Sequence, residues 1–174
     1  MGSINRVAVL GTGVMGSQIA AHISNVGIDV YAYDITQEIA EAGVKRSTEI
    51  KPNAFYNKKN AALVKPVNYE TDLGLLSECD WVIEAISENL EWKRELYKKI
   101  DPHLGKDSVL TSNTSGLLLS ELITETSEAI SSKLFITHFF NPPRYMRLVE
   151  VITSDRNNHD QLKEIFNFIE DSLG

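Results

Sequence analysis

Two residues of this 174-residue chain could form a proton-transfer pair, His138 and Glu150. Each lies in an apolar run that predicts a strand, and Pro142 and Pro143 force a turn between the runs. If the strands form a hairpin, the imidazole and the carboxylate lie side by side. The carboxylate would then fix the imidazole tautomer, and the other ring nitrogen could exchange a proton with a substrate. The alternative is a core histidine without a catalytic role.

Three glycines, Gly11, Gly13 and Gly16, have the spacing G-x-G-x-x-G between a short apolar strand and an apolar helical face. Gly11 permits a tight turn, Gly13 lets a pyrophosphate approach the backbone, and Gly16 lets the helix pack closely on the sheet. The helix N-terminus offers unpaired N–H groups to phosphates. The pattern predicts a dinucleotide site, with an ordinary strand–helix turn as the alternative. The candidate cofactor residues are Gly11, Thr12, Gly13, Val14, Met15 and Gly16.

Asp34 ends the second predicted strand. A carboxylate at this point can accept hydrogen bonds from both ribose hydroxyls of an adenosine. It would repel the 2′-phosphate of NADP, and the neighbouring Ile35 is not an arginine. We therefore expect NAD as the cofactor. With His138 as a base, NAD would suit oxidation of a secondary alcohol, because the base takes the hydroxyl proton while hydride leaves to the nicotinamide.

The composition is that of an ordinary globular protein, with 43% hydrophobic and 24% charged residues. The net charge of -7 does not favour a nucleic-acid or anionic-membrane surface. The single Cys79 cannot form an internal disulfide and fits a reducing cytoplasm. No membrane-spanning run, signal peptide or metal motif is recognisable. We expect one cytoplasmic domain with no metal, nucleic-acid or membrane partner.

The elements that must position these residues alternate between strands and helices. Strands are predicted at residues 7–10, 29–33, 66–69, 81–85, 108–111, 133–139 and 148–152. Helices are predicted at residues 15–26, 36–49, 71–77, 91–100 and 159–173. Residues 51–65 lose periodicity and form either a short helical excursion or an exposed loop. The alternation predicts an α/β fold, a doubly wound and mostly parallel Rossmann-type sheet in a single domain, in which the last strands can be antiparallel.

Two further predicted helices, beyond the one that follows the glycine motif, show apolar faces. In residues 91–100 the face consists of Trp92, Leu96 and Ile100. In residues 159–173 it consists of Leu162, Ile165, Phe166 and Ile169. We expect these faces to pack against the sheet.

Ligands of a doubly wound sheet bind at the carboxyl ends of its strands. The chemically interesting segments all fall at such ends: Gly11, Asp34, residues 86–89, residues 112–115 and His138. We therefore expect one site along this edge.

Four other polar residues near the edge are ambiguous. Ser115 and Asn141 could contact a substrate oxygen and the nicotinamide amide, but such loops also favour these residue types. Glu88 precedes a helix, where acids are favoured for other reasons. Lys93 alone is typical of a solvated helix face. Local context leaves all four undecided.

Four motifs occur in order along the chain and resemble those of a known family. They are Gly11-x-Gly13-x-Met15-Gly16, residues 83–90 (IEAISENL), residues 112–115 (SNTS) and residues 138–142 (HFFNP). Over about residues 6–152 the chain is similar to the NAD-binding domain of 3-hydroxyacyl-CoA dehydrogenases, enzymes of fatty-acid β-oxidation. The glycine motif is shared with many dehydrogenases, whereas Glu-Asn-Leu and His-Phe-Phe-Asn-Pro are specific to this family.

The resemblance implies a role for each matching residue. His138 would be the catalytic base and Glu150 its orienting partner, while Ser115 and Asn141 would contact both substrate and nicotinamide. The substrate would be an acyl-CoA, whose 3-hydroxyl is oxidised to a 3-oxo group. The other cofactor contacts would come from Asp34, Glu88 and Lys93.

Members of the family normally continue into an all-helical domain that closes over the acyl chain and forms the dimer. We therefore expect residues 1–174 to be the NAD-binding domain of a longer polypeptide, without that C-terminal domain and its dimer interface. The Pro-Pro-Arg-Tyr sequence after Asn141 resembles longer bacterial and archaeal members, some of them fused to a hydratase. A lysine that helps to hold CoA in the family has no clear match among Lys51, Lys58, Lys59 and Lys65.

Three interpretations follow. We favour an NAD-dependent 3-hydroxyacyl-CoA dehydrogenase, of which this chain is the cofactor half with little or no turnover of its own. The second is an NAD-binding module without turnover. The third is a related dehydrogenase acting on another small hydroxy acid. Residues 138–142 argue against the third, because sister families usually use a lysine as the base.

Overall fold

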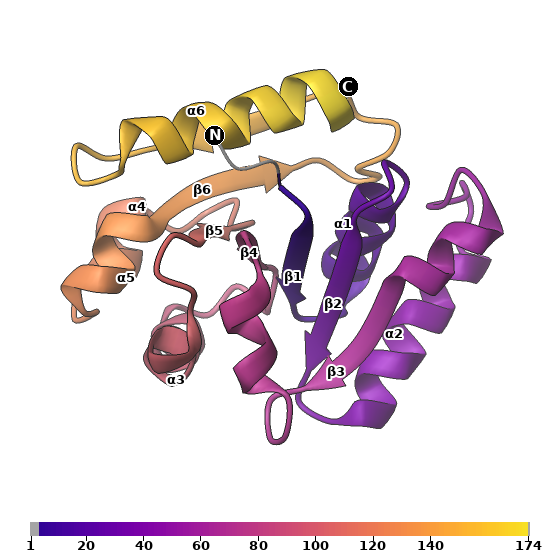
Figure 1. Cartoon of the computed structure of the whole chain (residues 1–174), viewed down its shortest axis with the longest axis horizontal. Coiled ribbons are helices and arrows are strands. Elements are labelled where there is room, and N and C mark those ends of the chain that lie inside the picture. Colours follow the sequence, from indigo (N-terminus) through magenta and orange to yellow (C-terminus); the bar gives the residue numbers. More distant parts are fainter. Residues whose placement is uncertain (1–3, 174) are drawn as a thin grey trace.

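The apolar runs form one seven-stranded sheet in the order β3-β2-β1-β4-β5-β6-β7 (Figure 1). The computed structural model describes residues 4–173. The strands are β1 (Arg6–Leu10), β2 (Asp29–Asp34), β3 (Val64–Asn68), β4 (Trp81–Glu84), β5 (Val109–Ser112), β6 (Leu134–Phe139) and β7 (Val149–Ile152). Strands β1 to β6 pair in parallel, and β7 pairs antiparallel with β6. The prediction of a doubly wound, mostly parallel sheet is confirmed.

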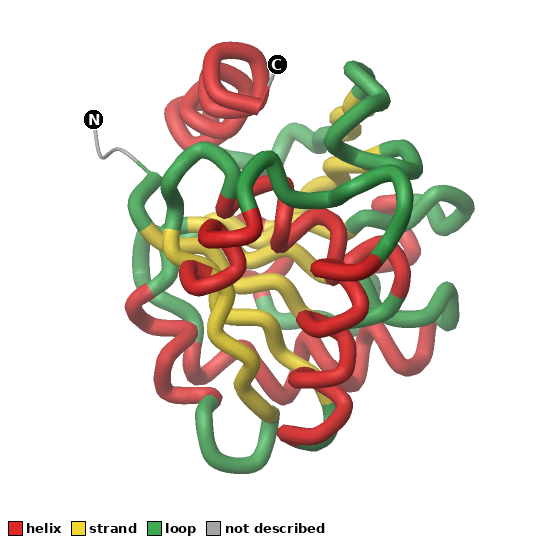
Figure 2. The backbone as a smooth tube through the Cα atoms, turned by 90° about the vertical axis from the view of Figure 1, so that its right-hand side faces the viewer, coloured by secondary structure: helices red, strands yellow, loops and turns green. Residues whose placement is uncertain are grey.

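Helices cover both faces of the sheet (Figure 2). The α-helices are α1 (Val14–Ser24), α2 (Gln37–Glu49), α3 (Leu90–Ile100), α4 (Leu119–Ile123), α5 (Glu128–Lys133) and α6 (His159–Phe168). Short 3₁₀ helices occur at Lys58–Leu63, Leu73–Glu78 and Asp101–His103, and a π-helical turn, Ile169–Leu173, follows α6. Helix α1 packs beside α2, and α3 packs beside α4. Within residues 4–173, every helix is too short or too polar to cross a bilayer.

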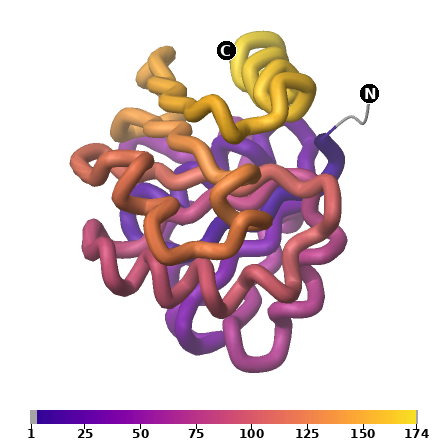
Figure 3. Tube along the Cα trace, turned by 90° about the vertical axis from the view of Figure 1, so that its left-hand side faces the viewer, coloured from indigo at the N-terminus to yellow at the C-terminus, as the bar shows by residue number. Residues whose placement is uncertain are grey.

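The central strands are buried on both faces, which explains why the sequence shows continuous apolar runs there. Side chains alternate along β4, so Trp81 and Glu84 point to opposite faces, and both are fully buried. The Trp81 ring meets the ring of Phe168 edge-on, with centroids 6.1 Å apart, which fixes α6 on this face. In Figure 3, α6 (yellow) lies at the top of the described chain.

The structure shows which parts of residues 51–65 are helical and which are irregular. Residues 50–57 are irregular, and the 3₁₀ helix Lys58–Leu63 is the helical excursion. Strand β3 begins at Val64, earlier than predicted, and contains Pro66. It tolerates the proline because it is the edge strand of the sheet.

The helices α4 and α5 are not among the elements predicted from the sequence. They are five and six residues long, too short for a helical repeat of apolar residues to be visible. Their caps are local, since the Ser127 side chain accepts a hydrogen bond from the backbone N–H of Ile130 at the start of α5.

The predicted buried faces of two helices are partly wrong. Trp92 is 58% exposed, and the buried residues of α3 are Lys93, Leu96, Tyr97 and Ile100. In α6, Ile165 is buried but Phe166 is 48% exposed. Because residues on a helix are separated by about 100°, packing of Ile165 and Phe168 against the sheet turns Phe166 outward.

Candidate active site

The glycine loop between β1 and α1 has three different environments. Gly11 has φ +97°, and a Cβ there would lie 2.9 Å from the Ala85 carbonyl oxygen. A Cβ on Gly16 would lie 1.9 Å from the Gly11 carbonyl oxygen. A Cβ on Gly13 would meet nothing within 4 Å. Gly11 and Gly16 are therefore required by packing, whereas Gly13 leaves open space at the N-terminus of α1, as a bound pyrophosphate needs.

Asp34 lies directly beside this loop. Its Oδ2 accepts hydrogen bonds from the backbone N–H and the hydroxyl of Thr12, at 2.8 and 2.6 Å. Thr12 is only 1% exposed, so its side chain holds Asp34 and does not face a ligand. Arg46 of α2 donates to the Thr12 carbonyl oxygen at 2.7 Å. A carboxylate oxygen accepts more than one hydrogen bond, so Asp34 keeps capacity for ribose hydroxyls.

A cleft of about 420 Å³ opens at the carboxyl ends of the central strands. Its walls come from the glycine loop, the loop after β4, the loop after β5 and the end of β6. Seven of the predicted site residues line it: Gly13, Val14, Met15, Glu88, Ser115, His138 and Asn141. The others, Gly11, Thr12, Gly16, Asp34, Lys93 and Glu150, lie behind or beside these.

His138 and Glu150 face each other across the antiparallel strands β6 and β7. The His138 Nδ1 atom lies 2.9 Å from Oε2 of Glu150. The predicted hairpin is thereby confirmed. The His138 ring also lies against Phe140, with centroids 4.5 Å apart, and lines the cleft, whereas the Glu150 side chain is 54% exposed. With Nδ1 directed to the carboxylate, Nε2 is the ring nitrogen available to a ligand.

Asn141 is held in the cleft by a residue that the sequence did not single out. Its Oδ1 accepts from the Gln18 amide at 3.2 Å, and the same amide donates to the Val14 carbonyl oxygen at 3.0 Å. Gln18 is only 3% exposed. Gln18 could have been noticed in the sequence because it lies on an apolar helix, where a buried amide needs hydrogen-bond partners.

Glu88 ties down the loop that carries Ser115. Its Oε1 accepts from the Thr114 hydroxyl and from the backbone N–H groups of Ser115 and Gly116, at 2.5, 3.0 and 2.9 Å. Partial burial disfavours the charged carboxylate, but these hydrogen bonds and the nearby Lys93 ammonium outweigh it and hold the pKa of Glu88 below its usual value.

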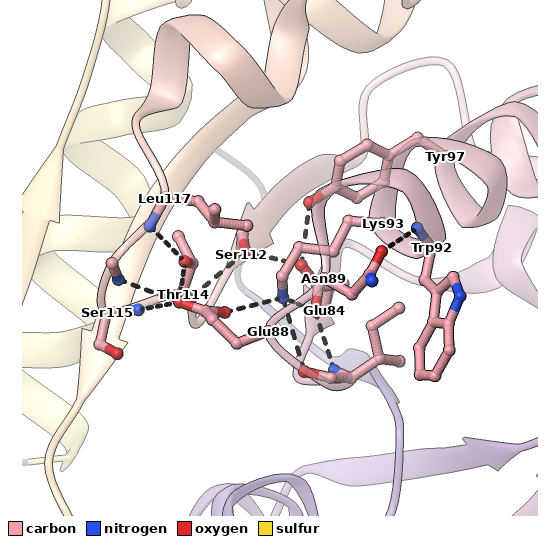
Figure 4. Close-up of polar contacts among 12 residues, drawn as sticks. Glu84, Glu88, Asn89, Trp92, Lys93, Tyr97, Ser112, Thr114, Ser115 and Leu117 are labelled. Carbon is pink, nitrogen blue, oxygen red and sulfur yellow. Dashed lines mark hydrogen bonds and ion pairs between the residues drawn. The ribbon is translucent and has the colours of Figure 1, made fainter.

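Lys93 is not on a solvated helix face. It is 1% exposed, and its ammonium lies 2.6 Å from Glu84 and 3.5 Å from Glu88 (Figure 4). Glu84, at the end of β4, is fully buried and was not predicted as a site residue. The signal for it was an acid at the end of the apolar run Trp81–Glu84, where an ionised side chain needs a partner.

The family model of the 3-hydroxyacyl-CoA dehydrogenase NAD binding domain matches residues 6–173. A Deinococcus radiodurans protein named "Probable 3-hydroxyacyl-CoA dehydrogenase" is 39% identical over 98% of this chain. The chain belongs to the 3-hydroxyacyl-CoA dehydrogenase family. Because the matched domain is its NAD-binding domain and the glycine loop leaves the space that a pyrophosphate requires, NAD is the cofactor that this chain is built to hold.

Two solved structures superimpose on nearly the whole chain. The (S)-3-hydroxybutyryl-CoA dehydrogenase of Ralstonia eutropha is 30% identical, with a TM-score of 0.81 over 99% of this chain and 62% of that one. A diketoreductase acting on dicarbonyl compounds is 29% identical, with a TM-score of 0.86 over 100% of this chain and 63% of that one. The fold of this chain therefore occurs in a dehydrogenase and in a diketoreductase.

The curated relatives are longer than this chain. It spans 51% of the Deinococcus radiodurans protein and about a quarter of several others. The longer relatives include a fatty acid oxidation complex subunit.

Proposed function

We propose that the protein containing this chain is an NAD-dependent dehydrogenase that oxidises the 3-hydroxyl of a 3-hydroxyacyl-CoA to the 3-oxoacyl-CoA in fatty-acid β-oxidation. The observation that carries the proposal is the hydrogen bond between His138 and Glu150 at the cleft beside the glycine loop. We also propose a cytoplasmic location, in keeping with the single, buried Cys79.

In this proposal His138 accepts the proton of the 3-hydroxyl at Nε2. Glu150 accepts a hydrogen bond from the Nδ1–H group, which keeps Nε2 unprotonated before reaction and stabilises the imidazolium afterwards. Bound NAD supplies the hydride acceptor at its nicotinamide ring. The acyl-CoA is the partner substrate, consistent with the names of the relatives.

Ser115 and Asn141 would orient the reacting groups. Both line the cleft together with His138, and each is held by a second residue, Ser115 through Glu88 and Asn141 through Gln18. Glu88 holds the backbone of Ser115 and Gln18 holds the side chain of Asn141, so a substrate oxygen and the nicotinamide amide would be bound with less loss of conformational entropy. Glu88 itself lines the cleft and can accept a hydrogen bond from the cofactor.

The direct test is reduction of acetoacetyl-CoA by the full-length protein. We expect oxidation of NADH and little oxidation of NADPH, because Asp34 would repel a 2′-phosphate. We expect residues 1–174 alone to bind NAD with little turnover, since a substrate pocket shared with a further domain needs both. Failure of the full-length protein to oxidise NADH with acetoacetyl-CoA would refute the substrate assignment.

A second candidate is reduction of a dicarbonyl compound that carries no CoA. The high TM-score to the diketoreductase favours it, because the same fold performs that reaction there. Turnover of free acetoacetate as fast as of acetoacetyl-CoA would support this candidate against the first.

A further inference from the structure

Glu84 is the centre of a buried network that the proposed chemistry does not use (Figure 4). Its Oε1 accepts from the Lys93 ammonium at 2.6 Å and from the backbone N–H of Ile86 at 2.8 Å. Its Oε2 accepts from the hydroxyls of Tyr97 and Ser112 at 2.9 and 2.6 Å. Four donors, from the loop after β4, from α3 and from β5, therefore fix the position of this carboxylate, which has no exposed surface.

Lys93 links this buried carboxylate to the cleft. Its ammonium lies between Glu84 and Glu88, and Lys93 does not itself line the cleft. The Ile86 carbonyl oxygen accepts a long hydrogen bond from the same ammonium at 3.5 Å. Lys93 can therefore influence a ligand in the cleft by fixing the position of the Glu88 carboxylate, which lines the cleft.

Glu88 transmits this constraint to the loop after β5. One of its oxygens faces Lys93, and the other accepts the three hydrogen bonds of residues 114–116. The strand order places β2, with Asp34, on one side of β1, and β4 and β5 on the other. A dinucleotide that crosses at β1 has its adenosine over β2, so the network lies beneath its nicotinamide end.

We propose that Glu84 is a positioning residue for the nicotinamide end of the cofactor site, acting through Lys93 and Glu88. The proposal rests on the proposed function, from which it takes the orientation of NAD. Glu84 holds the Lys93 ammonium 3.5 Å from Glu88. At this distance the ammonium restrains the Glu88 carboxylate but leaves Glu88 bonded to residues 114–116. A purely structural role, in which the buried ion pair only stabilises the fold, is the competing explanation.

The first test is the substitution Glu84→Gln, which keeps the shape of the side chain and removes its charge. Lys93 then has Glu88 as its only carboxylate partner among the described residues, and we expect it to pull Glu88 out of place. Calorimetric titration of residues 1–174 should show NAD affinity reduced about tenfold, or about 1.4 kcal/mol. Affinity for ADP, which lacks the nicotinamide riboside, should change less than about twofold. The matched control is Glu95→Gln on the exposed side of α3.

The double substitution Glu84→Gln, Lys93→Met distinguishes a positioning role of Glu84 from a purely structural role of the ion pair. It removes both buried charges, and replacing a buried ion pair in this way is often neutral for stability. We expect its thermal unfolding midpoint to return towards that of the unsubstituted chain, while NAD affinity stays low because Glu88 has lost its cation.

Three results would overturn the inference: unchanged NAD affinity in Glu84→Gln, an equal loss of NAD and ADP affinity, or recovery of NAD affinity together with stability in the double variant. Absence of NAD binding by the unsubstituted chain would instead refute the cofactor assignment and this inference together. The binding measurements do not depend on turnover, so an inactive chain still tests the network.

Discussion

The position of one proton decides what His138 can do. The 2.9 Å contact between its Nδ1 and Glu150 assigns the two ring nitrogens different tasks, one to the carboxylate and one to the substrate. The sequence predicted this contact from two strands joined by a proline turn. The catalytic roles of the two residues remain proposals, which the next substitution tests separately.

We expect Glu150→Gln to lower kcat with acetoacetyl-CoA by about tenfold or more and to leave the dissociation constant of NADH unchanged. The amide keeps the shape of the side chain but does not stabilise an imidazolium. Water compensates in part, because the Glu150 side chain is 54% exposed. Steady-state kinetics on the full-length protein measure the effect, with Glu95→Gln as the control. An unchanged kcat would show that His138 needs no carboxylate partner.

Among the structural elements, the loop between β1 and α1 contains one glycine that we expect to matter for NAD binding and another that matters for stability. Gly13 and Gly16 belong to one motif, but only Gly16 is enclosed by the backbone of Gly11. Gly13 has φ -61° and ψ -165°, a conformation open to other residues.

We expect Gly13→Ala to fold with normal stability and to lose NAD affinity, because its methyl group occupies the space required by the pyrophosphate. Gly16→Ala should instead unfold at lower temperature, because its methyl group meets the Gly11 carbonyl oxygen. Thermal unfolding and calorimetric titration of both variants distinguish the effects. If Gly13→Ala binds NAD normally, the pyrophosphate lies elsewhere.

The helices and strands differ in how well they could be predicted from the sequence. Strands and long helices were predictable because their apolar periods extend over many residues, as in α1 and α2. The helices α4 and α5 have no such period. The burial of Lys93 could not be predicted either, because its partner Glu84 is nine positions away on another element and the local pattern of α3 is polar. The contact between His138 and Glu150 was predictable because a turn within a short segment brings the two residues together.

At the scale of the whole molecule, the burial of His22 makes stability depend on pH. It is 4% exposed, and its Nδ1 has no hydrogen-bond partner within residues 4–173. Burial, and secondly the charge of Arg144, lower the pKa of His22 from 6.5 to about 4. Between these values the unfolded chain binds a proton that the folded chain does not. Stability is therefore lost as the pH falls from 6.5 to about 4.

At roughly 1.4 kcal/mol per pKa unit, this effect reaches about 3 kcal/mol at pH 4. We expect His22→Leu to remove it, so that the unfolding free energies of the variant and the unsubstituted chain diverge between pH 6.5 and 4. Denaturant titrations across this range provide the measurement. His159→Leu, at the exposed start of α6, should keep the original pH dependence. Parallel curves for His22→Leu and the unsubstituted chain would contradict the assignment.

The proposed dehydrogenase mechanism requires His138 as the base. Oxidation of NADH by acetoacetyl-CoA should be compared in the full-length protein, in His138→Ala and in the control His159→Ala. We expect His138→Ala to lower kcat by about 10²- to 10⁴-fold with an unchanged dissociation constant for NADH, and the control to behave normally. Normal turnover by His138→Ala would contradict the proposed mechanism.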